Sequence, residues 1–417
     1  MGYALRSSLT LLLAVLLLLA VPLSATAQVI TPAEAIEILA TSHTPDFPRQ
    51  VGFALKARGA ADIVKATLRF KQVGQATVTT SRLKFAPSRA VELHYDWDLQ
   101  RHYVPPGVEI EYYWLLEDAE GRTARTPAET FLVEDKRFAW RSVADGPVRV
   151  YWYEGDEPFA RELLAAGRRA LDQLAADAGV TADTPVKVFV YASQRDLLSA
   201  LRPSAQEWTG GQAFTEQSIV VVAVEPSDAG LSWGRRVLPH EISHVVVHRM
   251  TKNPYGDLPS WLDEGLAMYA EGELEASYRR RLAEAIDGDR LISVRSLAAN
   301  FPSDPEVALL SYAQSHSLVS FIIDEYGADR LAKLLSVFKE GSTYDDALQA
   351  ALGVDTAGLE AAWRASVGAP PAAARRAAPG GEERNAPLFA VGWALPVLAA
   401  AAVGLGLALL LLRSRSS

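Results

Sequence analysis

The sequence predicts a multidomain α+β protein that begins with a β-sandwich and continues into a small mixed sheet with a helical lobe. Residues 29–137 contain short segments with alternating apolar positions or with many β-branched and aromatic residues. Strand and helix patterns alternate in the first part of residues 138–367, and helical patterns fill the rest. A third feature, the uncharged apolar run at residues 388–412, predicts a membrane-spanning helix.

Composition limits the classes of protein that fit this chain. With 417 residues, of which 49% are hydrophobic and 22% charged, the chain is long enough for two or three domains with buried cores. The formal net charge of −9 and the lack of a long basic run argue against a nucleic-acid partner. The absence of cysteine excludes disulfides, thiolate metal ligands and thiol catalysis.

The N-terminal end, residues 1–27, has the pattern of a secretory signal peptide. Arg6 precedes an apolar run from Leu9 to Val21. Small residues follow from Ala25 to Ala27, which predicts cleavage before Gln28. We therefore expect the mature protein to be exported.

The C-terminal end has the pattern of a membrane anchor. Arg413 and Arg415 directly follow the apolar run at 388–412, so the positive-inside rule predicts a cytoplasmic tail at residues 413–417. Residues 368–387 are rich in alanine, proline, glycine and arginine and are expected to form a flexible stalk. The sequence thus predicts a single-pass protein of a bacterial cell membrane, with its N-terminal domains outside the cytoplasm.

The predicted β-sandwich occupies residues 29–137. Its clearest strand patterns begin at Val51, Ala66, Ala90 and Val108. Several short strands at this spacing are typical of sandwiches of the immunoglobulin or fibronectin-III type. Nothing in this part of the sequence names a ligand.

The second predicted unit, residues 138–367, starts with strands and ends with helices. Apolar strand patterns occupy Val148–Tyr153, Val186–Tyr191 and Ile219–Val224, and a helix pattern at Pro158–Ala178 separates the first two. From residue 279 onward the pattern is helical, and glycines stand where helix C-caps belong, at Gly327, Gly341 and Gly353.

The strongest chemical signal is the motif H-E-x-x-H at His240, Glu241 and His244. Positions i and i+4 share one face of a helix, so both imidazoles can reach one ion. Twenty residues after His244, Glu264 can supply a third ligand from a second helix-forming segment. Three protein ligands and one open position are what a catalytic zinc needs.

Two neighbours of this motif need separate treatment. His248 continues the i+4 spacing, but it lies two turns from His240, roughly 12 Å along a straight helix. We therefore expect His248 to support the structure rather than to bind the same ion. Pro239 directly precedes His240, which requires that a helix start or kink there because proline has no backbone donor.

The segments H-E-I-S-H and W-L-D-E-G-L-A-M-Y together resemble the gluzincin zinc metallopeptidases, in particular the peptidase MA-like domains of bacteria. The similarity covers roughly residues 150–365. It implies a small twisted sheet above the motif helix and a helical lower lobe. It also implies one Zn²⁺ ion bound by His240, His244 and Glu264, with Glu241 as general base for the water at the zinc.

The same resemblance implies a peptide or protein substrate. In this family an extended peptide binds along an edge strand above the motif helix. The strand Ile219–Val224 has the similar position here, so we expect the substrate to pair with it.

Two supporting roles stay open. Some relatives have an acid four residues after the glutamate ligand, where this chain has Met268, so Asp263, Glu271 or a backbone carbonyl could orient the histidines. The donor that stabilises the oxyanion could be Tyr312, which resembles the family's position better, or His316.

We therefore expect a membrane-anchored, extracytoplasmic zinc metallopeptidase. One alternative is a catalytically silent protein of the cell envelope that holds zinc and acts in binding or as a scaffold. Another is a zinc hydrolase of non-peptide amides. The intact Glu241 favours an enzyme, because a chain without catalysis has no chemical need for that carboxylate.

Overall fold

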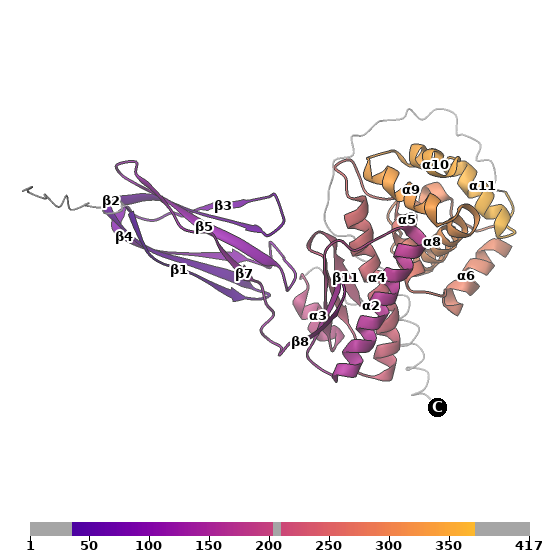
Figure 1. The fold of residues 1–417 in the computed structure, drawn as a ribbon, viewed down its shortest axis with the longest axis horizontal. Coiled ribbons are helices and arrows are strands. Elements are labelled where there is room, and N and C mark those ends of the chain that lie inside the picture. The colour runs from indigo at the N-terminus through magenta and orange to yellow at the C-terminus, as the bar shows by residue number, and fades with distance from the viewer. Residues whose placement is uncertain (1–35, 203–209, 372–417) are drawn as a thin grey trace, which may run out of the picture.

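The computed structural model describes residues 36–202 and 210–371. A β-rich region precedes a five-stranded mixed sheet, and a group of helices follows (Figure 1). The chain is therefore of the mixed α+β class that the sequence predicts.

The β-rich region (residues 36–132) is a seven-stranded sheet organised around its long second strand. The first half of β2, Gln50–Gly59, pairs with β1 and β4. The second half, Ile63–Gln72, pairs with β3 and β5 and, at Ile63, with the start of β4. The strands are β1 (Ile36–Asp46), β2 (Gln50–Gln72), β3 (Thr79–Arg82), β4 (Ser88–Asp98), β5 (Glu109–Asp118), β6 (Thr123–Arg125) and β7 (Glu129–Leu132).

Both halves of β2 contribute to one core in this region. Leu55 from the first half and Leu68 from the second are fully buried in the same cluster as Trp114 of β5. Because β2 runs on between its two halves, hydrogen bonding joins all seven strands in one sheet. The expected sandwich of two separate immunoglobulin-like sheets is therefore not confirmed.

The second sheet has the strand order β11-β12-β10-β9-β8. Its three inner strands are parallel to one another, and the two edge strands run antiparallel to their neighbours. The strands are β8 (Arg141–Asp145), β9 (Val148–Trp152), β10 (Val186–Tyr191), β11 (Gly211–Phe214) and β12 (Ile219–Ala223).

This strand order corrects the expected substrate edge. The segment Ile219–Val224 was expected to be an edge strand, but β12 lies inside the sheet between β10 and β11. All five residues of β12 are buried, as its uninterrupted apolar run requires of a strand covered on both faces. The edge strand on that side is β11, which is only partly buried.

The two faces of the second sheet pack against different parts of the chain. Alternate side chains such as Val188 and Val220 share a core with helices α2 (Glu157–Ala178) and α4 (Asp228–Thr251). Residues between them, such as Phe189 and Val221, share the core of the β-rich region instead. A short helix, α3 (Gln194–Ala200), contacts the same side.

The remaining helices form the lobe on the other side of α4 (Figure 1). Helix α5 approaches α8 closely at Gly265, where a Cβ atom would lie 2.6 Å from the backbone oxygen of Ser315. Gly353 ends α10 in the left-handed conformation, with φ of 79°. The helices are α5 (Ser260–Ala270), α6 (Ala276–Asp287), α7 (Val294–Leu297), α8 (Pro305–Tyr326), α9 (Ala328–Lys339), α10 (Tyr344–Leu352) and α11 (Thr356–Ser366).

The predicted location in a membrane is wrong, because the described helices do not support it. Within residues 36–202 and 210–371, no helix is both long enough and apolar enough to cross a bilayer. The segments for which a signal peptide (1–27), a membrane helix (388–412) and a cytoplasmic tail (413–417) were expected lie outside the described residues. The same holds for most of the expected stalk.

Candidate metal centre

Helix α4 carries both histidines of the motif on one buried face. The helix begins after Ser227, whose side chain accepts a hydrogen bond from the backbone of Gly230 and so caps the first turn. His240 and His244 are 2% and 6% exposed, and their Nε2 atoms are 3.2 Å apart. Pro239 lies inside α4, so the helix does not start at this proline.

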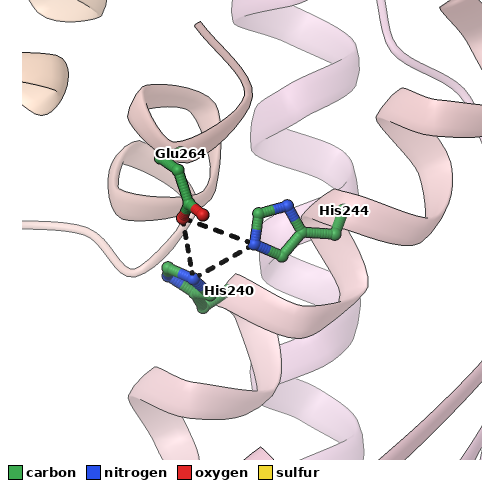
Figure 2. Close-up of side chains that lie close together, drawn as sticks. All are labelled: His240, His244 and Glu264. Atoms are coloured by element: carbon green, nitrogen blue, oxygen red, sulfur yellow. Dashed lines mark hydrogen bonds and ion pairs between the residues drawn. The ribbon is translucent and has the colours of Figure 1, made fainter. Parts of the chain in front are cut away.

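Glu264 on α5 completes a group of three potential metal ligands (Figure 2). Its Oε2 atom is 3.5 Å from His240 Nε2 and 3.6 Å from His244 Nε2. A tetrahedral ion with bonds of about 2.0–2.1 Å separates its ligand atoms by about 3.3 Å. Glu264 Oε2 is also buried without a hydrogen-bond partner, so the three atoms fit one ion in both spacing and chemistry.

Two carboxylates orient the imidazoles from behind. His240 Nδ1 lies 2.8 Å from Glu271 Oε1, and His244 Nδ1 lies 3.0 Å from Asp263 Oδ2. With each Nδ1–H donating to its carboxylate, the Nε2 lone pair of each ring points to the ion site. Both acids considered from the sequence therefore have a role here, one for each histidine.

Arg236 holds the carboxylate behind His240. Its guanidinium donates a hydrogen bond of 2.7 Å to Glu271 and also contacts Glu275. Burial raises the pKa of Glu271, but His240 and Arg236 outweigh burial and lower it below its ordinary value. Sequence reasoning missed Arg236, although it lies one helical turn before His240 and so shares its face.

The surroundings of the two imidazoles favour positive charge. Burial alone lowers the pKa of both rings, but neighbouring carboxylates reverse this effect. For His244, the charges of Asp263 and Glu264 raise the pKa to about 9. A site that attracts a positive charge so strongly is suited to a divalent cation.

Glu241 lies beside this site without a side-chain partner. Its side chain is completely buried, and within residues 36–202 and 210–371 neither carboxylate oxygen has a hydrogen bond to another side chain. Burial raises the pKa of Glu241, although His240 and His244 oppose the shift. Strand β11 covers this carboxylate closely, because a Cβ atom at Gly211 would lie 2.9 Å from Glu241 Oε1. The carboxylate is thus free to accept a proton from a group in the site.

Tyr312 on α8 lies within the electrostatic reach of the same carboxylates. It is 2% exposed and packs against the ring of Phe301. Burial raises the pKa of Tyr312, and Glu264 and Glu241 raise it further, so the hydroxyl keeps its proton. Tyr278 on α6 is a second buried tyrosine near these charges, and no motif in the sequence singles it out.

A comparison with known families assigns this part of the chain. Residues 166–369 match the family model of the peptidase MA superfamily. This region is a peptidase MA-like domain. The matched range includes both histidines, Glu241, Glu264 and the three residues behind the imidazoles. No curated protein matches the chain.

Solved structures resemble the chain only distantly. Aminopeptidase A from Legionella pneumophila, in complex with aspartic acid, shares 12% identity over 79% of this chain and 49% of its own, with a TM-score of 0.35. Catalytically inactive OgpA from Akkermansia muciniphila, in complex with an O-glycopeptide, shares 11% identity over 25% and 32%, with a TM-score of 0.19. A polysaccharide deacetylase from Bacillus cereus shares 13% identity over 45% and 59%, with a TM-score of 0.21. The chain spans less than two thirds of each, and likenesses this weak carry no argument.

Two further histidines of the peptidase MA-like domain lie away from the ligand atoms. His248 Nε2 is 3.1 Å from Glu216 Oε1 and is not part of the metal-ligand group. His316 lies beside Gly272 and Tyr269, where it lines a separate cavity of about 540 Å³. Of the two oxyanion donors considered from the sequence, Tyr312 is the one whose pKa Glu264 and Glu241 affect.

Proposed function

We propose that this chain is a zinc-dependent metallopeptidase of the gluzincin type that hydrolyses peptide bonds. One observation carries the proposal. Three ligand atoms 3.2–3.6 Å apart lie beside Glu241, a buried carboxylate that has no side-chain partner among the described residues. The match to the peptidase MA superfamily supports the same reaction class.

The proposed mechanism assigns a role to each side chain. A bound zinc ion would polarise the scissile carbonyl and lower the pKa of water at the open ligand position. His240, His244 and Glu264 hold the ion, and Glu241 takes the proton from the attacking water. Glu241 then passes this proton to the leaving amine, a task that its raised pKa favours.

We assign the oxyanion donor to Tyr312. A tyrosine hydroxyl can donate a hydrogen bond to the developing negative charge only while it is protonated. The raised pKa of Tyr312 supports this role, and so does the influence of Glu264 and Glu241 on it. The contacts of His316 with Gly272 and Tyr269 leave it less suited.

The substrate would bind as an extended peptide along the free edge of β11. This strand pairs with β12 on one side and covers Glu241, so a peptide on its other side would pass the ion site. Its edge position makes β11 the better candidate than β12.

The experiment compares wild type with Glu241→Gln in the purified full chain. Both proteins should bind about one zinc, and the variant should lose peptide hydrolysis by roughly 10²–10⁴-fold because the general base is gone. Glu162→Gln, at an exposed acid on α2, is the control and should be unaffected. Metal content is measured by elemental analysis and hydrolysis with a peptide library.

The outcomes separate the alternatives. Zinc binding without hydrolysis in wild type would favour the silent zinc-holding protein. Hydrolysis of acetylated amines but not of peptides would favour an amide hydrolase of another class. A folded chain that binds no zinc at neutral pH would exclude all three zinc proteins.

A further inference from the structure

The strand proposed to receive the substrate, β11, has few hydrogen bonds within its own sheet. Strand β11 has four residues, and among the strands that the structure describes it pairs only with β12. It is joined to β12 by the 3₁₀ turn η1 (Thr215–Gln217) and Ser218, so residues 211–223 form an edge hairpin. A short strand with one neighbour opens easily unless contacts outside the sheet hold it.

The β-rich region supplies such contacts through the turn between β2 and β3. The side-chain amide of Gln75 donates to the backbone oxygen and to Oε2 of Glu216, both at 3.3 Å. Gln217 donates from its own amide to Gln72 Oε1 at 2.8 Å. These bonds join positions about a third of the chain apart, and they meet at the tip of the edge hairpin.

Glu216 links this contact to the helix that carries the histidine ligands. Its carboxylate also accepts hydrogen bonds from His248 of α4 and from Lys252, the residue that follows α4. Burial raises the pKa of Glu216, but the bonds from Lys252, His248 and Gln75 outweigh it and keep the group ionised. One carboxylate therefore joins the β2–β3 turn, the edge hairpin and α4.

Apolar packing fixes the same junction along its length. The ring of Phe214, the last residue of β11, lies 5.6 Å from that of Tyr103. Gly107 lies against Phe189 of β10 so closely that a Cβ atom would lie 2.6 Å from the ring. Tyr103 also donates to the backbone oxygen of Ala200. The β-rich region thus covers the sheet beneath the edge hairpin.

We infer that the β-rich region is a positioning element of the peptidase site, which holds β11 in place for an extended substrate through Gln72 and Gln75. The contact between the β-rich region and the edge hairpin follows from these hydrogen bonds and does not depend on any activity. Its effect on substrate binding rests on the proposed function. This role differs from that of a separate adhesion or recognition module, which would need no bond to the edge hairpin.

The first test uses amide hydrogen exchange and needs no catalysis. In the full chain, Gln72→Ala combined with Gln75→Ala should speed exchange of the amides at 211–218 by roughly tenfold, because the three hydrogen bonds to the hairpin are lost. Exchange at 240–247 in α4 should not change. Gln100→Ala is the control, since it removes a glutamine bond to Pro48 within the β-rich region but away from the junction.

The second test is a split between KM and kcat. The double variant should raise KM about tenfold for peptides long enough to pair with β11 and leave kcat and zinc content unchanged. A blocked dipeptide, too short to pair along the strand, should show wild-type KM. A general loss of stability would instead lower activity on both substrates alike.

These results distinguish the two proposals. Exchange at 211–218 equal to that of Gln100→Ala would overturn the positioning role. A wild-type chain that hydrolyses nothing would overturn the proposed function, and the exchange experiment would still decide whether the β-rich region holds the hairpin.

Discussion

At the scale of single residues, the arrangement behind His240 sets how well the site can hold an ion. Glu271 receives one hydrogen bond from the imidazole and one from Arg236. A buried carboxylate without its cation gains a proton more easily and then stops accepting from His240. Arg236 thus acts on the ion through two intervening side chains.

We predict that Arg236→Gln weakens zinc binding by about 10–100-fold, as loss of outer-shell partners typically does. Arg236→Lys should retain part of the affinity because the charge remains. Arg235→Gln provides the matched control, since this neighbour points to the exposed Glu162. Titration against a competing chelator measures the affinities, and equal values for all four proteins would contradict the role of Arg236.

The residues that could hold an ion were predictable from the sequence, but those around them were less so. His240, His244 and Glu264 follow from spacing along two helices, which is local information. Asp263 and Glu271 were both named as candidates, and only the packing of α5 against α4 pairs each with its own histidine. Arg236 belongs to no sequence motif. Its role depends on its contact with Glu271, which lies at the C-terminal end of α5.

At the scale of elements, the separation between β11 and α4 determines whether Glu241 can act as the proposed general base. Gly211 allows the backbone of the strand to lie directly on this carboxylate. The strand order itself was not predictable, because four residues of mixed polarity give no clear pattern. The apolar run of β12 is equally compatible with an inner strand and with a covered edge, so the pairing with β11 had to come from the structure.

We predict that Gly211→Ala lowers peptide hydrolysis by about 10²-fold, because the added methyl group displaces Glu241 or the strand. Zinc content should remain at the wild-type value, since the three atoms nearest to the new group all belong to Glu241. Gly256→Ala is the control, because a Cβ atom there meets nothing within 4 Å. Unchanged turnover in Gly211→Ala would show that β11 does not limit the position of Glu241.

At the scale of the whole molecule, the ion site lies where the major parts of the chain meet. Strand β11, helix α4 and helix α5 converge on it, and α8 supports α5 from behind. Four carboxylates gather there, and Arg236 pairs with one of them, Glu271. The other three are Glu241, Asp263 and Glu264. Burial of these charged groups costs free energy, and a bound divalent cation would offset part of this cost.

We therefore predict that removal of zinc by a chelator lowers the melting temperature of the full chain. A ligand at a hundred times its dissociation constant contributes about 2.7 kcal/mol to the free energy of unfolding. Adding zinc back should restore the melting temperature, as measured by calorimetry. The variant Glu264→Ala should respond much less, and a chelator effect of equal size in that variant would place the ion elsewhere.

The shortness of β11 also has a consequence for substrate choice under the proposed function. Four residues offer few backbone groups to a partner, and the strand lies close over a helix. A rigid sheet edge of a folded protein would gain only these few hydrogen bonds at the strand. A locally unfolded segment or a free peptide loses no structure of its own when it pairs with β11. Under the proposed function, we therefore expect proteins to be cleaved according to how readily they unfold locally.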